Sequence, residues 1–249
     1  QHEDGSSHLL FSTVPNCVAY DPTYGYEVVT IIQDGTRRML EKQDDVFYYV
    51  TVMNENYSHP SMPDGANEGI IKGMYCLQKG EKSSGPRVQL LGSGTILRET
   101  LAAADLLQID WNVYADVWSV TSFTELRRDG LSVDRQNTYN PGLTEKSTWV
   151  EQCLKSTVGP IIAATDYMRA VPDMIRTWAP RRYVTLGTDG YGRSDTRKSL
   201  RDFYEVDRFH ITLAALKSLV ADGSIKKSVL GQAIKKYGLK GDRPNPWDI

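Results

Sequence analysis

Short apolar runs alternate with longer stretches of helical periodicity along most of the chain, a pattern typical of strands and helices that follow one another in turn. The runs predicted to be strands are residues 17–20, 46–52, 87–91, 112–120, 161–164 and 183–186. The stretches predicted to be helices are residues 24–40, 95–108, 166–178, 207–221 and 224–237, with further helices starting near 122 and 195. This order predicts an α/β fold in which helices cover both faces of a mostly parallel sheet.

Several predicted helices begin or end at residues that commonly cap helices. Asp21 suits the N-cap of the helix at 24–40, and Ser194 that of the helix from 195. Ser122 followed by Glu125 matches a capping box that opens a short helix, after which residues 133–147 show less regular periodicity. Gly238 is a typical residue to end the last helix.

A polar segment rich in turn residues, NENYSHPSMPDGANEG at 54–69, interrupts this alternation. It contains Pro60, Pro63 and Gly65, which disfavour regular structure. We therefore predict a boundary near residue 63, with one domain over residues 1–62 and a second over residues 63–249.

Composition limits the classes of function. The 249 residues are 40% hydrophobic and 24% charged with a formal net charge of -2, which favours neither nucleic acid nor an acidic membrane as a partner. No apolar run has the roughly 18 to 20 residues of a membrane helix, and no signal peptide is recognisable, so we expect a cytoplasmic protein. Cys17, Cys76 and Cys153 are far apart and predict reduced thiols. The chain starts in a polar loop without Met, and we expect it to be the later part of something longer.

Two glycine-rich turns lie between a predicted strand and a predicted helix, LGSGT at 91–95 and LGTDGYGRSD at 186–195. Backbone amides at such a turn can hold a phosphate. Neither turn has the spacing of a P-loop or of a dinucleotide-binding motif, and glycine alone explains tight geometry. A structural role is favoured for both, and the common hydrolase motifs are absent.

The sequence has only four histidines. His59 in the polar segment and His210 at a helix start are expected to be surface or partly packed residues. The remaining two lie in the opening loop, where four neighbouring side chains could in principle bind a metal: His2, Glu3, Asp4 and His8. A Gly-Ser loop does not fix ligand geometry, so no metal site is predicted.

Three stretches, in order, resemble the transketolase superfamily of thiamine-diphosphate enzymes. They are HEDGSSH with VPNCVAYDPTYGYE, then VQLLGSGTILRETLAAADLL with ADVWSVTSFTEL, then GTDGYGRSDTRKSLRDFYEVDRFHITLAALKSL. Further stretches, including NENYSHPSMPDG, SVTSFTELRRDG and ATDYM, are most similar to the C-terminal third of the first component in the homodimeric-type pyruvate dehydrogenase family. The resemblance implies the end of a pyrimidine-binding-type domain, then a transketolase C-terminal-like domain with a mostly parallel five-stranded sheet.

The same resemblance implies an activity for the intact parent. Such enzymes decarboxylate pyruvate with thiamine diphosphate and Mg, and pass the acetyl unit to lipoyl groups on an acyltransferase component. The Gly-Asp-Gly motif of the cofactor-binding region is absent from this sequence. We therefore expect no cofactor on this chain alone and no activity in isolation. The implied partners are the missing N-terminal domains, a second subunit of a homodimer and the lipoyl acyltransferase.

Within the resemblance, the opening loop carries the candidate catalytic residues. His2 matches the family's active-site histidine, and His8 matches the histidine of the superfamily's Asp-Gly-x-x-His motif. A histidine suits hydrogen bonding to a carboxylate or proton relay. Glu3 and Asp4 are expected to shape the loop. An alternative hypothesis is a non-catalytic α/β assembly or regulatory module whose glycine-rich turns bind a small anionic effector.

Overall fold

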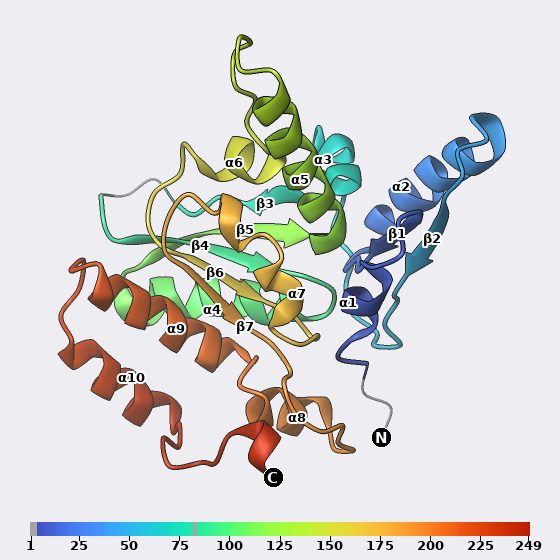
Figure 1. The fold of residues 1–249 in the computed structure, drawn as a ribbon. Helices are drawn as coiled ribbons and strands as arrows, with labels where there is room; N and C mark the ends of the chain where they lie inside the picture. Colours follow the sequence, from blue (N-terminus) through green and yellow to red (C-terminus); the bar gives the residue numbers. More distant parts are fainter. Residues whose placement is uncertain (1–3, 82–83) are drawn as a thin grey trace.

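The computed structural model describes residues 4–81 and 84–249, and its central feature is a five-stranded sheet (Figure 1). The strand order is β3 (Met74–Gln78), β5 (Tyr114–Val120), β4 (Arg87–Gly92), β6 (Ile161–Ala164) and β7 (Tyr183–Leu186). Strands β5, β4, β6 and β7 run parallel to one another, and β3 runs antiparallel to β5. The predicted α/β class and mostly parallel sheet are confirmed.

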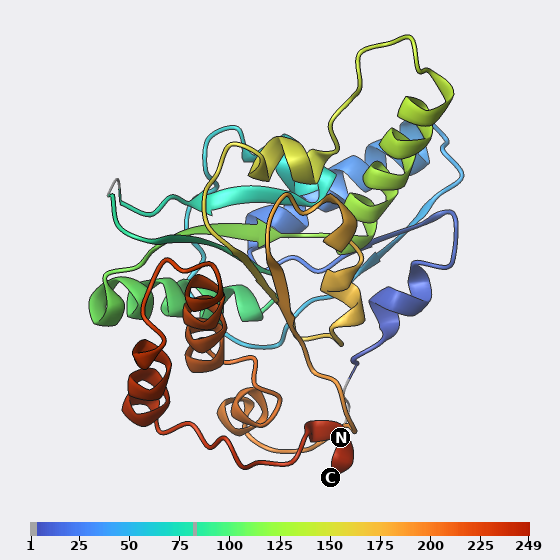
Figure 2. The ribbon, with the colours of Figure 1, turned by 60° about the vertical axis from the view of Figure 1, so that its left-hand side comes forward.

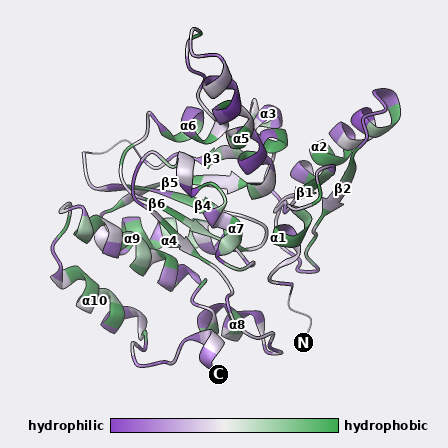
Figure 3. Ribbon diagram, in the orientation of Figure 1, coloured by the Kyte–Doolittle hydropathy of each residue, from purple (hydrophilic) through white to green (hydrophobic). Residues whose placement is uncertain are grey.

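Helices cover both faces of this sheet because successive strand residues point to opposite sides. On one face, Leu90 and Ile162 pack with α4 (Ile96–Trp111) and α9 (Arg208–Ala221). On the other face, Leu91 and Ile161 pack with α5 (Phe123–Tyr139), α6 (Trp149–Leu154) and α7 (Ala170–Asp173). The two layers flank the strands in Figure 2, where α10 (Ser228–Tyr237) lies outside α9. Figure 3 shows apolar residues along the strands and polar residues at the far end of α5.

The N-terminal segment forms a second, smaller sheet beside the first (Figure 1). It comprises α1 (Ser7–Phe11), β1 (Cys17–Tyr20), α2 (Gly25–Thr36), the π-helical turn Arg37–Glu41 and β2 (Phe47–Val50). Strands β1 and β2 pair in parallel, with Cys17 opposite Phe47 and Tyr20 opposite Val50. A third core joins this unit to α3 (Ala66–Lys72) through Ile31 and Ile70, both fully buried.

Two apolar patterns in the N-terminal segment are only partly buried. The β-branched and aromatic residues at 46–52 are typical of a buried strand, yet Phe47 on β2 is 42% exposed. Val28, Ile31, Ile32 and Met39 fall roughly on one side at helical spacing, yet Ile31 is buried whereas Ile32 and Met39 lie at the surface. A two-stranded parallel sheet covers few side chains, so these apolar residues remain partly exposed.

The helix predicted at 166–178 is also wrong. Residues 170–173 form α7 and Arg176–Trp178 a 3-10 turn, while residues 166–168 are not helical. Their backbone groups form hydrogen bonds with distant residues instead. Thr188 N–H donates to the carbonyl of Tyr167 at 2.9 Å, and Met168 N–H donates to that of Gly5 at 2.9 Å. These long-range bonds replace the helical ones.

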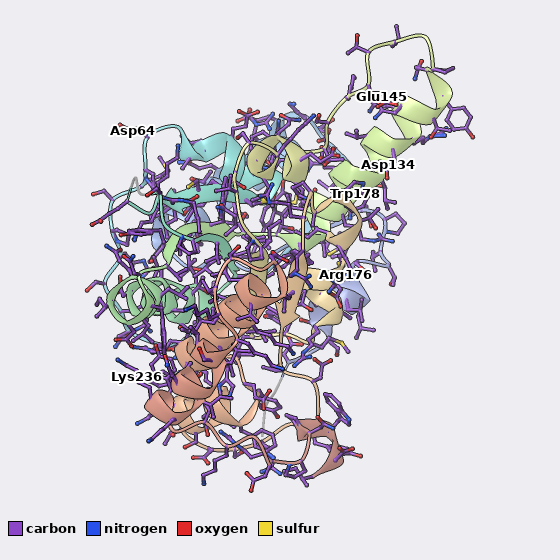
Figure 4. The ribbon with its side chains drawn as sticks, turned by 90° about the vertical axis from the view of Figure 1, so that its left-hand side faces the viewer. Asp64, Asp134, Glu145, Arg176, Trp178 and Lys236 are labelled. Atoms are coloured by element: carbon purple, nitrogen blue, oxygen red, sulfur yellow. The ribbon has the colours of Figure 1, made fainter. Side chains whose placement is uncertain are left out.

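Helix α5 is longer than the short helix predicted after Ser122, and it continues through residue 133 to Tyr139. Ser122 caps it as expected, with its Oγ accepting from Glu125 N–H at 3.0 Å. Trp178 Nε1 donates to Asp134 Oδ2 at 3.0 Å and supports the distal half; the two side chains are labelled in Figure 4. Packing against the turn at 176–178 therefore extends a helix of weak periodicity.

Other ends of elements differ more modestly. Helix α8 (Arg197–Phe203) begins after Thr196 rather than Ser194, and Thr196 Oγ1 accepts from Ser199 N–H. Gly238 ends α10 in a left-handed conformation with φ 65°, as expected. Strand β3 and helices α3 and α6 were not predicted, since each is short and lacks a distinctive period.

Candidate functional site

A cleft of about 670 Å³ opens where the carboxyl ends of β2, β6 and β7 meet α8. Thr51 follows β2, Asp166 follows β6, and Thr188 follows β7. Helix α8 contributes Arg201, and the opening loop contributes Asp4. Ligands of parallel α/β sheets bind beyond the carboxyl ends of the strands, so this cleft is the natural candidate site in the chain.

Carboxylates and guanidinium groups face each other in and around the cleft. Burial raises the pKa of Asp166 to about 6, assisted by the negative charge of Asp21. Arg201 Nη2 lies 3.0 Å from Glu55 Oε2, and its Nη1 lies 3.4 Å from Glu99 Oε1, so its charge is already paired. The cleft therefore holds a carboxyl group able to exchange a proton near neutral pH, and no strong uncompensated positive charge at Arg201.

The opening loop is shaped by Asp4. Its Oδ1 accepts from Ser7 N–H at 3.0 Å, and its Oδ2 accepts from Ser7 Oγ at 2.5 Å. Asp4 also accepts from the Tyr49 hydroxyl at 3.3 Å. It thus closes the turn that precedes α1, as expected. The candidate residue His2 and its neighbour Glu3 lie outside the described residues.

His8 lies on α1 and is only 4% exposed. Its Nε2 is 3.2 Å from Thr51 Oγ1, and its ring meets the edge of Tyr167 at a centroid distance of 4.5 Å. Burial lowers the pKa of His8 to about 4, against the opposing effect of Asp4. The imidazole is therefore neutral at pH 7, and it lies behind the cleft wall formed by Thr51 and Tyr167.

Asp21 is a functional candidate that the sequence did not reveal. It was expected to cap α2, but the N-cap of that helix is Tyr24. Asp21 Oδ1 instead accepts from the Thr51 hydroxyl at 2.8 Å. Its other oxygen, Oδ2, is buried with no hydrogen-bond partner among residues 4–81 and 84–249. Burial raises the pKa of Asp21 to about 6, and the bond from Thr51 opposes that rise.

Both glycine-rich turns are packed closely against neighbouring backbone or side-chain atoms. In the first, Gly94 N–H donates to the Asp21 carbonyl at 3.1 Å and Ser93 N–H to the Ala164 carbonyl at 3.3 Å. A Cβ at Gly94 would lie 2.5 Å from Asp21 Oδ2, so a carboxylate already occupies the space beside this turn. In the second, Gly187 packs against the Tyr167 carbonyl, and its Cβ would lie 2.5 Å from that oxygen. Both support the structural role expected from their spacing.

The other two histidines are exposed at 59 and partly buried at 210, as expected, and both have local partners. His59 Nδ1 accepts from Gly25 N–H at 2.8 Å. His210 Nδ1 lies 2.8 Å from Asp207 Oδ1, and Asp202 is the third member of this close group. Asp207 Oδ1 also accepts two N–H groups at the start of α9, and both Asp202 oxygens bind Arg243. Each of these groups has a partner within the protein.

Comparisons with known proteins match two family models to the chain. Residues 73–207 match the transketolase-like TK C-terminal domain, and residues 1–60 match the pyruvate dehydrogenase E1 component middle domain. The chain is also similar along its whole length to proteins named pyruvate dehydrogenase E1 component. It is 56% identical to that of Cupriavidus necator and 57% identical to that of Pseudomonas aeruginosa, over 100% of this chain and 28% of each relative. The Escherichia coli K12 protein is 49% identical over 99% of this chain.

Solved structures show the same fold at low sequence identity. A transketolase from Pichia stipitis has a TM-score of 0.60 at 15% identity and covers 88% of this chain and 27% of its own. The transketolase from Campylobacter jejuni has a TM-score of 0.58 at 16% identity, covering 84% of this chain and 27% of its own. The chain thus spans little more than a quarter of the curated relatives that it matches. None of the helices in the described part of the chain is long and apolar enough to cross a membrane.

Proposed function

The chain belongs to the family of transketolase-like C-terminal domains, and from this premise we propose that it works as the carboxyl-terminal part of a pyruvate dehydrogenase E1 component. The intact parent would decarboxylate pyruvate and pass the acetyl unit to lipoyl groups. The observation that carries the proposal is identity of 56% over the full chain to a protein of that name, with the middle-domain match at residues 1–60. These two matches also support a domain boundary near residue 63.

The chain's own contribution is one wall of the reaction pocket. The opening loop is held against the large sheet by the bond from Met168 N–H to the Gly5 carbonyl, and Asp4 fixes its turn. His2 is proposed as the group that contacts substrate, by hydrogen bonding to its carboxylate or by moving a proton. His8 is proposed as a second catalytic histidine. It contacts the wall of the cleft at Thr51.

Thiamine diphosphate supplies the electron sink for decarboxylation in such enzymes. The turn at 91–95 does not fit its diphosphate and Mg, because the Ser93 and Gly94 amides are bonded within the protein and the Asp21 carboxylate lies beside Gly94. We propose that both are bound by parts of the parent outside this chain, and that the chain alone binds neither.

Partner surfaces are proposed on the small sheet. Exposed apolar side chains there include Val29 and Ile32 on α2, Leu40 on the turn that follows it, and Phe47 and Val52 on and just after β2. Parallel sheets are ordinarily covered on both faces, and clustered apolar residues mark surfaces that contact other protein. We propose that preceding domains of the parent and the second subunit cover this region. We also propose that the intact parent delivers the acetyl unit to the lipoyl acyltransferase and is located in the cytoplasm.

A chimera tests the function. The matching 28% of the Cupriavidus necator protein is replaced by this chain, and pyruvate decarboxylation is measured with thiamine diphosphate and Mg. The chimera is expected to be active, and its His2→Ala variant to lose at least about a hundredfold in rate, the usual contribution of a positioned proton donor or acceptor. His59→Ala, at a histidine outside the cleft, is the matched control and should keep most of the rate. A folded chimera without activity contradicts the proposal.

The isolated chain supplies a second test. It is expected not to consume pyruvate even with thiamine diphosphate and Mg. Turnover by the purified chain would contradict the proposal that the cofactor is bound by parts of the parent outside this chain. The alternative of an effector-binding module is not favoured, since the first glycine-rich turn is closed by Asp21. Calorimetric titration with nucleotides and phosphorylated metabolites should give no heat of binding at millimolar ligand.

A further inference from the structure

Thr51 joins the buried carboxylate of Asp21 to the buried ring of His8, in a line of three side chains from three separate segments. We propose that Asp21, acting through Thr51, is a positioning residue that holds His8 as the tautomer protonated on Nε2 and leaves Nδ1 as a hydrogen-bond acceptor. The inference deepens the function proposed above for His8, on which it rests.

The count of hydrogens decides the direction of each bond. A threonine hydroxyl has one hydrogen to donate and lone pairs with which to accept. Thr51 Oγ1 lies 2.8 Å from Asp21 Oδ1 and 3.2 Å from the Tyr20 carbonyl oxygen. The shorter contact is to a carboxylate, and hydrogen bonds to an ionised acceptor are the stronger ones. The hydroxyl hydrogen of Thr51 therefore points to Asp21.

With that hydrogen used, Thr51 can only accept from His8. The contact of 3.2 Å between His8 Nε2 and Thr51 Oγ1 is then a hydrogen bond in which Nε2–H donates. A neutral imidazole carries one N–H, so Nδ1 keeps its lone pair. Burial, which lowers the pKa of His8 to about 4, keeps the ring neutral at pH 7. At neutral pH, His8 can therefore accept a hydrogen bond at Nδ1 but cannot donate one there.

Aromatic packing holds the His8 ring in contact with Thr51. Tyr167 and Tyr49 both meet the ring edge to face, at centroid distances of 4.5 and 5.5 Å. Asp21 is equally fixed, because its N–H donates to the Thr121 carbonyl at 2.7 Å and its carbonyl accepts from Gly94 N–H at 3.1 Å. Both ends of the line are held by the fold, so Thr51 is the part that can be altered with least disturbance.

The test is nitrogen-15 NMR on the 249-residue chain labelled at histidine, at pH 7.5. Ring nitrogen shifts separate a protonated from an unprotonated nitrogen, and the signal missing in His8→Gln identifies His8 among the four histidines. We expect protonated Nε2 in the unaltered chain and in Thr51→Ser, which keeps the hydroxyl. In Thr51→Val the ratio of Nε2–H to Nδ1–H should fall at least about fivefold, since the acceptor is gone.

Asp21→Asn is the second variant, in case Thr51→Val does not fold. It removes the charge that orients the Thr51 hydrogen, and the same ratio should fall in the same direction. Protonated Nδ1 in the unaltered chain overturns the proposal, as does a ratio unchanged in both folded variants. The measurement needs neither substrate nor cofactor, so its failure is distinct from failure of the chimera: an inactive chimera with protonated Nε2 would leave the positioning of His8 by Asp21 standing.

Discussion

Replacement of Glu27 should destabilise the protein more than replacement of any exposed carboxylate, because Glu27 bonds the small sheet to the large one. Its side chain is fully buried. Oε2 accepts from the N–H groups of Thr23 at 2.5 Å and Tyr24 at 2.9 Å, at the start of α2. Oε1 accepts from the hydroxyls of Tyr75 on β3 at 2.7 Å and Ser119 on β5 at 2.6 Å. One carboxylate thus satisfies four donors from both sides of the boundary predicted near residue 63.

The loss in the free energy of unfolding depends on how many of these four donors keep a hydrogen-bond partner. In Glu27→Ala all four lose their acceptor, and at about 1 kcal/mol for each buried donor the loss is about 4 kcal/mol. In Glu27→Gln the amide oxygen can still accept from the two backbone N–H groups, while the amide NH₂ can donate to hydroxyls that rotate. Its cost should be about half, roughly 2 kcal/mol.

Urea unfolding followed by far-ultraviolet circular dichroism measures both changes as differences in the free energy of unfolding. Glu68→Ala is the control, because Glu68 makes an exposed pair with Lys72 on α3 at 2.8 Å and should matter by less than about 0.5 kcal/mol. Equal losses for Glu27→Gln and Glu27→Ala, or a loss below about 1 kcal/mol for alanine, would refute the assignment of acceptors to backbone and hydroxyl donors.

Two further predictions concern pH and a glycine. The folded pKa of Asp21 is raised from 3.8 to about 6, so its contribution to stability is present below pH 3.8 and lost as the pH rises to about 6. The folded pKa of His8 is lowered from 6.5 to about 4, so the protein loses stability as the pH falls from 6.5 to about 4. In Asp21→Asn the stability should therefore rise more steeply between pH 4 and 6, by about 3 kcal/mol in total, and an unchanged slope in pH-dependent urea titrations would contradict this. Gly159→Ala should prevent folding or cost more than about 3 kcal/mol, because φ is +83° and a Cβ would lie 1.7 Å from the Arg87 carbonyl oxygen. Thermal melting tests this prediction beside Gly142→Ala, where a Cβ meets nothing within 4 Å and the midpoint should not move.

Local composition was enough to locate several elements. Strands β1, β6 and β7 lie where short apolar runs between turn residues predicted them. The caps at Ser122 and Gly238 were also recognisable, because each acts through its own side chain or backbone freedom. The ordered motifs that resemble the transketolase superfamily are supported by the family matches at 1–60 and 73–207.

Elements whose hydrogen bonds go to distant residues were not predictable in this way. Residues 166–168 have a helical pattern, yet their carbonyl and N–H groups bond to Thr188 and Gly5. Helix α5 extends to Tyr139 since Trp178, far along the chain, packs on it and bonds to Asp134. Periodicity measures only near neighbours, and these partners are not near in sequence.

In the candidate site, too, some residues were predictable from the sequence and others only from the tertiary structure. The sequence by itself marked His8 as a candidate and Asp4 as the residue that shapes its loop. It gave no sign that Asp21 and Thr51 belong with them, because these residues are 30 positions apart. Parallel pairing sets Tyr20 opposite Val50, so the chain leaves both strands at the same edge, and Asp21 meets Thr51 there. Only that pairing, which requires a crossover through α2, decides that a buried carboxylate reaches the histidine.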